Sequence, residues 1–327
     1  MKEQTIQTLP IANDPALSTE IKAFLTALNS GGGPPLETMT PADARNVLVG
    51  AQKSVEVDIS GIEKSEKIIV SDGMEIKLNI VRPEGATGAL PVFIFIHGGG
   101  WVLGDYPTHE RLVRDLVVDS GAAAVFVNYT PSPEAQYPMA INQIYAATKW
   151  VADNGSEINV DGKRLAIVGN SVGGNMTAAV TLMAKDKGGP EIKVHIMLWP
   201  VTDANFDTGS YHQFANDRFL TRDMMIWFWD CYTSDPEKRK EYYASPLQAT
   251  LEQLKGLPPA VIHVAENDVL RDEGEAYARK LNLAGVKVSV ARFDGLIHDY
   301  GMLNPLSYIP NVKSAILYAA AELKKHL

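Results

Sequence analysis

The hydrophobic positions of the chain alternate between short continuous apolar runs and longer segments with a helical period. Apolar runs of four to eight residues are typical of the strands of a parallel sheet that is covered on both faces. Such runs lie at 91–96, 123–129, 164–169, 193–200, 259–266 and 287–293. Segments between them carry apolar residues on one helical face, as at 108–119 and 272–284. The pattern predicts an α/β fold with a mostly parallel central sheet and helices on both faces.

Two parts of the chain interrupt this alternation. Residues 1–55 are helix-like and mixed in polarity, and 203–244 is an aromatic and charged insertion. We expect these two parts to form a helical cap over the carboxyl ends of the strands. The α/β core then comprises 56–202 and 245–327.

An antiparallel hairpin is predicted at the start of the core. The run Ile68-Ile69-Val70 and the alternating residues 74–80 flank Asp72-Gly73, a dipeptide that favours tight hairpin turns. Such a hairpin fits the edge of a mixed sheet.

The amino-acid composition limits the possible functions. The 327 residues are 46% hydrophobic and 21% charged, which is ordinary for a globular protein. The net charge of −9 offers no basic surface for nucleic acid or an anionic membrane. A single cysteine, Cys231, excludes an intrachain disulfide, favours a reducing compartment and is expected to be a buried, inert thiol. Without a signal-peptide-like or membrane-spanning apolar run, a cytoplasmic location is expected.

A candidate nucleophile follows the strand predicted at 164–169. The sequence Gly-Asn-Ser-Val-Gly at 169–173 places Ser171 one residue after that strand, where a helix begins. A serine on such an elbow is held out of the sheet, and the helix N-terminus favours developing negative charge. Because the chain contains 26 glycines, the motif alone is weak, and its position carries the argument.

A glycine-rich segment ends the strand predicted at 91–96. It reads HGGGW, and Gly98, Gly99 and Gly100 can turn several N–H groups towards one oxyanion. A phosphate-binding loop is disfavoured because no Lys-Ser/Thr follows. His97 is expected to hold the loop through hydrogen bonds rather than to transfer protons.

An acid and a base follow the last two predicted strands, in the order that Ser-Asp-His hydrolases use. Asp268 follows 259–266, and His298 follows 287–293. Other acids are possible: Asp272 sits near a predicted helix start, Glu266 lies within the strand, and Asp299 adjoins the histidine. The other histidines lack metal-ligand spacing, so no metal and no cofactor are expected.

These motifs together resemble the hormone-sensitive-lipase-like family of α/β-hydrolases, the bacterial carboxylesterases marked by the HGGG motif. The resemblance runs from about 91 to 301 and includes HGGGWVLGDYPTHERLVRDL, FLTRDMMIWFWDCY and GLPPAVIHVAENDVLRDEGEAYARKL. It implies Ser171 as nucleophile, Asp268 as acid and His298 as base. It also implies an oxyanion hole formed by the N–H groups of Gly99, Gly100 and Val172, and a cap that sets the acyl and alcohol pockets.

The chain departs from the family pattern at four places. Asn170 and Val172 stand where the family has Asp and Ala around the serine, and Val269 replaces a proline after the acid. Asp299-Tyr300 replaces glycine-phenylalanine after the histidine. We expect Val172 to narrow the acyl pocket and Asn170 to remove a charge near the serine. We expect an aromatic segment of the insertion to pack within the cap rather than to form a wall of the substrate pocket. Its residues are Trp227, Phe228 and Trp229, with Met224 and Met225.

The sequence predicts a serine carboxylesterase that hydrolyses short- to medium-chain acyl esters through an acyl-enzyme. One alternative is an amide, formamide or lactone hydrolase with the same triad. Others are acyl transfer to an alcohol and, in another class, a non-catalytic small-molecule receptor on the same fold. The expected partner is a small-molecule ester, and the edge strand at 287–293 could support a homodimer.

Overall fold

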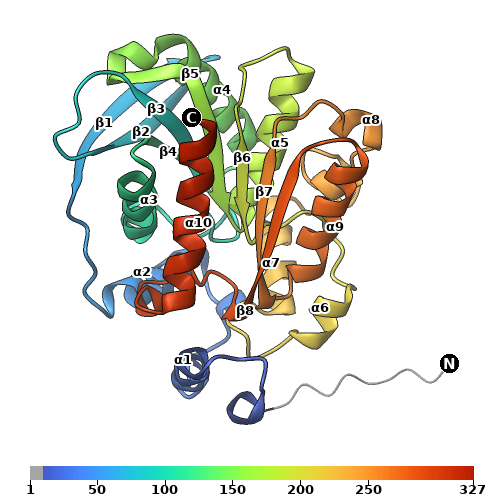
Figure 1. The fold of residues 1–327 in the computed structure, drawn as a ribbon. Coiled ribbons are helices and arrows are strands. Elements are labelled where there is room, and N and C mark those ends of the chain that lie inside the picture. The colour runs from blue at the N-terminus through green and yellow to red at the C-terminus, as the bar shows by residue number, and fades with distance from the viewer. Residues whose placement is uncertain (1–9) are drawn as a thin grey trace.

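The computed structural model describes residues 10–327. Its centre is one eight-stranded sheet in the order β1-β2-β4-β3-β5-β6-β7-β8 (Figure 1). β2 pairs antiparallel with both β1 and β4, and the pairs from β4 to β8 are parallel. The strands are β1 (Ile62–Ser71), β2 (Met74–Pro83), β3 (Leu90–Ile96), β4 (Ala123–Asn128), β5 (Val160–Asn170), β6 (His195–Leu198), β7 (Ala260–Asn267) and β8 (Val288–Ile297). This mixed, mostly parallel sheet confirms the predicted fold class.

The predicted hairpin is β1 and β2. Asp72 and Gly73 both have positive φ, 48° and 76°, as a tight hairpin turn requires. Several strands differ in length from the prediction, and β5 is longer because it begins at Val160. β6 is shorter and ends before Trp199, whose φ is 40°. β8 is longer, because after a register shift Ile297 still pairs with Asn267. His298 therefore follows the end of a strand directly.

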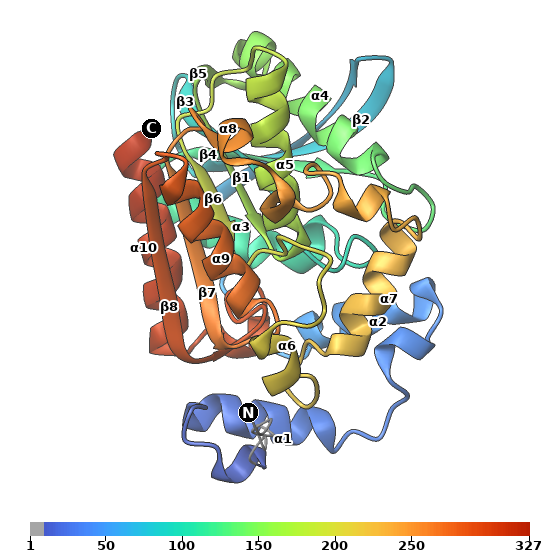
Figure 2. The ribbon, with the colours of Figure 1, turned by 90° about the vertical axis from the view of Figure 1, so that its right-hand side faces the viewer.

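Helices cover both faces of the sheet. α3 and α10 pack together on one face, and α4, α5 and α9 lie on the other (Figures 1 and 2). The α-helices are α1 (Thr19–Asn29), α2 (Pro41–Lys53), α3 (Tyr106–Ser120), α4 (Met139–Asn154), α5 (Val172–Asp186), α6 (Gly209–Gln213), α7 (Arg222–Tyr232), α8 (Leu251–Leu254), α9 (Arg271–Leu283) and α10 (Pro310–His326). Among residues 10–327, no helix is long and apolar enough to cross a membrane.

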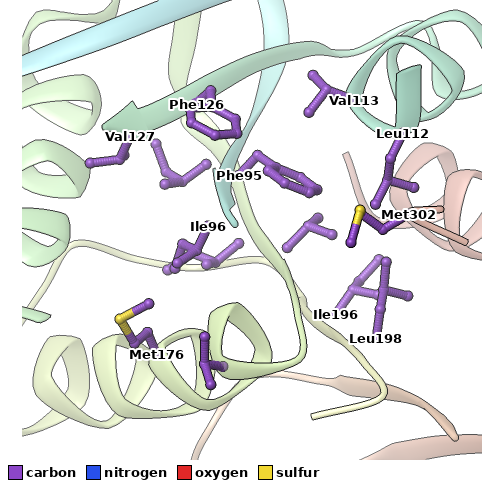
Figure 3. Close-up of a cluster of buried hydrophobic side chains, with 14 of the residues drawn as sticks. Phe95, Ile96, Leu112, Val113, Phe126, Val127, Met176, Ile196, Leu198 and Met302 are labelled. Atoms are coloured by element: carbon purple, nitrogen blue, oxygen red, sulfur yellow. The ribbon is translucent and has the colours of Figure 1, made fainter. Parts of the chain in front are cut away.

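The core is packed from both faces of the central strands. Phe95 and Ile96 are neighbours in β3 and point to opposite faces, as strand geometry requires (Figure 3). Phe95 faces Leu112 of α3, and Ile96 faces Met176 of α5. All four side chains are buried, so the strand is apolar throughout because both of its faces are covered.

Four helices lie beyond the end of the sheet where the parallel strands finish. They are α1, α2, α6 and α7, from the two parts of the chain that interrupt the strand–helix alternation (Figures 1 and 2). All four begin at a hydroxyl residue whose side chain accepts a hydrogen bond from the first helical turn: Ser18 from Ile21 N, Thr40 from Asp43 N, Thr208 from Tyr211 N, and Thr221 from Met224 N.

Candidate active site

Ser171 lies on a strained turn between β5 and α5. Its φ and ψ are 56° and −122°, a combination that a residue with a Cβ rarely adopts. The turn is tight because glycines flank it. A Cβ on Gly173 would lie 2.0 Å from the backbone oxygen of Ile96, and one on Gly169 would lie 2.2 Å from that of Gly173. The predicted elbow is present, and Ser171 follows the last strand residue, Asn170, directly.

Three buried side chains form a continuous hydrogen-bond relay. Ser171 Oγ lies 2.9 Å from His298 Nε2, and His298 Nδ1 lies 2.7 Å from Asp268 Oδ2. The second carboxylate oxygen, Asp268 Oδ1, accepts a 2.9 Å hydrogen bond from the N–H of Leu270. This is the geometry that an imidazole needs to take the serine proton while a carboxylate fixes its tautomer.

Opposing effects set the pKa of His298. Burial disfavours the imidazolium, but the charges of Asp268 and Asp299 and the hydrogen bond to Asp268 favour it. The net effect raises the pKa of His298 above 6.5. The imidazolium that forms when the serine is deprotonated is therefore stabilised.

The structure separates Asp268 from the other candidate acids. Asp272 is in the first turn of α9, after the cap residue Leu270, and accepts a 2.7 Å hydrogen bond from Ser210 N. Glu266 lies in β7 and accepts from the N–H of Gly295. Asp299 Oδ2 is 3.8 Å from the Nε2 side of His298, not its Nδ1 side. Of these carboxylates, only Asp268 bonds Nδ1.

Three backbone N–H groups border the relay. Gly99 and Gly100 adopt φ values of 103° and 63°, and Val172 is the first residue of α5. Within residues 10–327, none of these three N–H groups donates a backbone hydrogen bond. Gly99 and Gly100 line one cavity together with Ser171 and His298. The arrangement offers donors to an oxyanion beside the serine.

The glycine loop is held from beneath by Asn170. The N–H of Gly98 donates a 3.0 Å hydrogen bond to Asn170 Oδ1. A Cβ at position 98 would lie 2.6 Å from Asn170 Nδ2 and 3.0 Å from the Cβ of Ser171, so only glycine allows this approach. The amide nitrogen of Asn170 in turn donates to Asp299 Oδ1 at 3.1 Å. The sequence indicated the lost charge at position 170 but not this bridge.

His97 stacks within the core rather than facing the serine. Its ring lies between Tyr129, at a centroid distance of 4.2 Å, and Phe126, at 5.3 Å. Its Nδ1 lies 2.8 Å from the carbonyl oxygen of Gly98. Burial lowers the pKa of His97 to about 4, so the ring is neutral at pH 7. The ring thus contacts the glycine loop, and the supporting role of His97 stays a prediction.

A largely apolar cavity of about 780 Å³ opens onto Ser171 and His298. Its walls come from α1, α2 and α7, from the glycine loop, and from the segment after His298. The main apolar lining residues are Phe24, Leu28, Leu36, Met39, Val47, Leu48, Leu103, Phe219, Leu220, Met224, Met225, Phe228, Met302 and Pro305. A cavity of this size and character suits a small organic ligand.

The aromatic segment of α7 has two roles, whereas the sequence favoured packing alone. Trp229 packs, with its ring centroid 4.8 Å from that of Trp101. Phe228, by contrast, lines the cavity beside Gly100, where a Cβ would lie 2.1 Å from the Phe228 ring. The signal that was missed is the helical spacing: Met224 and Met225 lie four and three residues before Phe228, on the same side of the helix, and line the same cavity wall.

Two further expectations concern cysteine and metals. Cys231 is half-buried rather than buried, and burial raises the pKa of its thiol, which lowers its nucleophilicity at neutral pH. In the part of the chain that the structure describes, no group of three or more His, Cys, Asp or Glu residues could hold a metal ion.

Comparison with known proteins identifies the family. Residues 93–302 match the family model described as alpha/beta hydrolase fold. Carboxylesterase NlhH of Mycobacterium tuberculosis is 34% identical over 264 residues, which cover 80% of this chain and 82% of the relative. The ethyl acetate hydrolase of Pseudomonas putida is 27% identical over 321 residues, covering 95% and 100%.

Solved structures agree with this match. A thermostable esterase from Pseudomonas putida ECU1011 is 63% identical and superposes with a TM-score of 0.95, covering 96% of this chain and 98% of the other. The chain belongs to the α/β-hydrolase-fold family. Within it, the chain is a serine carboxylic ester hydrolase of the hormone-sensitive-lipase-like group, which confirms the resemblance noted in the sequence.

Proposed function

We propose that the chain hydrolyses short- to medium-chain acyl esters through an acyl-enzyme on Ser171. The observation that carries this proposal is the relay of Ser171, His298 and Asp268, which opens into an apolar cavity. The confirmed part is the class, carboxylic ester hydrolysis. The individual residue roles and the range of acyl chains are the proposal.

In the first half of the reaction, His298 Nε2 takes the proton of Ser171 as Oγ attacks the ester carbonyl carbon. The carbonyl oxygen becomes an oxyanion and accepts hydrogen bonds from the N–H groups of Gly99, Gly100 and Val172. Collapse of this intermediate breaks the bond to the alkoxy oxygen, and the imidazolium gives its proton to the leaving alcohol. Ser171 then carries the acyl group.

In the second half, water replaces the alcohol. His298 takes a proton from water, whose oxygen attacks the acyl carbon, and the same three N–H groups stabilise the second oxyanion. The bond to Ser171 Oγ breaks, the imidazolium returns the proton to Oγ, and the carboxylic acid leaves. Asp268 remains ionised and holds His298 Nδ1 throughout.

The cavity supports the proposed substrate range. Its volume of about 780 Å³ accommodates an acyl chain and an alcohol group of moderate size, and its lining is mostly apolar. Val172 is fully buried at the start of α5 and is not among the residues that line the cavity, so its narrowing of the acyl pocket stays a prediction. The Pseudomonas putida relative named as an ethyl acetate hydrolase agrees with a small acyl group.

The test is covalent labelling with a fluorophosphonate, followed by kinetics on aryl esters of increasing acyl length. The wild-type protein should be labelled, and Ser171→Ala should lose both the label and roughly 10³-fold or more in kcat. Asn46→Ala, at an exposed position on α2, is the matched control and should label normally. Labelling that persists in Ser171→Ala would remove Ser171 as the nucleophile.

The alternative activities need the same relay and differ in substrate. An aryl acetate compared with an anilide, an N-formyl compound and a lactone separates the ester hydrolase from an amide, formamide or lactone hydrolase. Added alcohol reveals acyl transfer through a new ester product. A receptor would bind such compounds without turning them over.

Domain division and assembly are also proposals. The cap would comprise 1–55, of which residues 1–9 lie outside the described part, together with 203–244, and the core would comprise 56–202 and 245–327. β8 is a terminal strand of the sheet, and its Val290 is 51% exposed, which supports pairing of two copies along this edge. A monomeric mass in light scattering would contradict the homodimer. The cytoplasmic location stays a prediction.

A further inference from the structure

The segment after His298 is fixed by a side chain of the N-terminal helix α2. Gln52 is 4% exposed, and its Oε1 accepts a 2.9 Å hydrogen bond from the N–H of Asn304. Its Nε2 donates to the carbonyl oxygen of Met302 at 3.0 Å and also to that of Thr108 in α3. The side-chain amide of Asn304 donates to the backbone oxygen of Gln52 at 3.0 Å. One buried glutamine thus bonds the backbone at two positions, four and six residues beyond the histidine.

Two turns earlier on the same helix, Arg45 fixes the glycine loop. Its Nε donates a 2.8 Å hydrogen bond to the carbonyl oxygen of Val102. The N–H of Val102 bonds the oxygen of Gly99, so Arg45 bonds the turn that contains the two oxyanion donors. Nη2 of Arg45 also donates to the oxygen of Ser132 at 3.1 Å, and the guanidinium pairs with Glu134 at 2.7 Å.

We propose that Arg45 and Gln52 are positioning residues that set the placement of His298 relative to the oxyanion donors Gly99 and Gly100. They are seven residues apart, so a helix separates them by about 10.5 Å along its axis and places them on one side. Because Arg45 bonds one loop and Gln52 bonds the other, a rigid α2 fixes the distance between the two loops. This inference rests on the proposed function, because it assumes that His298 and the glycine loop act on the same substrate.

The helix also contacts the substrate cavity. Leu48 and Ala51 lie between the two positioning residues and line the cavity that opens onto Ser171. α2 therefore bonds both loops and also contributes to the cavity wall. The histidine segment has a second support from the core, since Arg111 of α3 donates to the oxygens of Gly301 and Met302 at 2.6 and 3.0 Å. We therefore expect loss of Gln52 to misplace the base without unfolding the sheet.

The test measures the chemical step separately from binding. A fluorophosphonate gives kinact, which reports attack by Ser171, and KI, which reports occupation of the cavity. Gln52→Leu and Arg45→Met should each lower kinact at least about tenfold and change KI less than about twofold, because misplacement by about 1 Å costs rate rather than binding. Asn46→Ala, exposed on the same helix, should match the wild type. Unchanged kinact, or a change in KI alone, would overturn the proposal.

A double variant tests whether the two contacts act through one helix. Independent sites at this separation combine by multiplying their effects. If α2 acts as one rigid element, Arg45→Met/Gln52→Leu should have a kinact near that of the slower single variant. A multiplicative loss would reject this shared action. Arg45 is 29% exposed, so Arg45→Met alone still decides the proposal if the buried Gln52→Leu does not fold. Absence of labelling in the wild type would instead refute the proposed function.

Discussion

Nδ2 of Asn170 donates a 3.1 Å hydrogen bond to Oδ1 of Asp299, linking the residue before the candidate nucleophile to the residue after the candidate base. Trp199 Nε1 donates to the same oxygen at 2.7 Å. Both positions depart from the pattern of the family, which has aspartate before the serine and glycine after the histidine. An aspartate at position 170 would oppose Asp299 across this short distance, so the two departures complement each other. Compared with the family pattern, this chain carries the negative charge at position 299 instead of position 170.

The first prediction concerns pH. Because Asp268 and Asp299 raise the pKa of His298 above 6.5, and the neutral imidazole is the active form, kcat/KM should rise with pH through a region above 6.5. Asp299→Asn removes one of the two charges and should move this rise to lower pH. The exposed Asp153→Asn serves as the control. A rise centred below 6.5 in the wild type, or no displacement in Asp299→Asn, would contradict the assignment.

The second prediction exchanges the two side chains. Asn170→Asp keeps an acceptor for the N–H of Gly98 but loses the donor to Asp299 and buries two carboxylates together. It should lower the free energy of unfolding by about 3 kcal/mol. Adding Asp299→Asn restores a donor opposite the introduced carboxylate and should recover most of that loss. Urea unfolding of the single and double variants measures this directly, and additive losses would show that the pair is not coupled.

The third prediction tests the backbone of the elbow. A methyl group at Gly173 would approach the backbone oxygen of Ile96 to 2.0 Å, where neither partner is a flexible side chain. Gly173→Ala should therefore destabilise the fold by about 3 kcal/mol or more. At Gly50 in α2, apart from its chain neighbours and the adjacent helix backbone, no atom of residues 10–327 lies within 4 Å of an added Cβ, so Gly50→Ala should be neutral or stabilising by up to about 1 kcal/mol. Thermal unfolding of the two alanine variants should rank them in that order.

The fourth prediction concerns acyl length. Phe228 closes the cavity beside Gly100 and is 3% exposed. Phe228→Leu keeps an apolar side chain and opens space near the oxyanion donors, so kcat/KM for an aryl octanoate should rise relative to the acetate by about tenfold. Trp227→Leu, on the same helix but outside the cavity lining, should leave the ratio unchanged. An unchanged ratio in Phe228→Leu would place the acyl chain elsewhere.

Strand positions and the order of the reactive residues were predictable from the sequence. The central strands are continuous apolar runs because both of their faces are covered, and the carboxyl ends of neighbouring parallel strands meet at one edge of the sheet. Ser171, Asp268 and His298 follow β5, β7 and β8, so their convergence follows from chain order and parallel pairing alone. The role of Gly169 and Gly173 was also predictable, because a tight elbow leaves no space for a Cβ at these positions.

Contacts between distant polar side chains were not predictable. Nothing in the local pattern of Gln52 indicates that it bonds Asn304, since the two residues are 252 positions apart. The bridge from Asn170 to Asp299 likewise spans 129 positions and depends on how two loops pack. The cavity wall on α7 was missed because a core-facing and a ligand-facing aromatic residue have the same helical period.

Because of the strand order, catalytic activity requires the complete sheet to be folded. The candidate base is 127 residues from the nucleophile and 30 from the acid, and it follows β8, the last strand within residues 10–327 and one of the two edge strands of the sheet. A chain still emerging from the ribosome has its nucleophile and glycine loop but not its histidine. Because β8 pairs with β7, recovery of esterase activity during refolding requires this strand pair as well as collapse of the core.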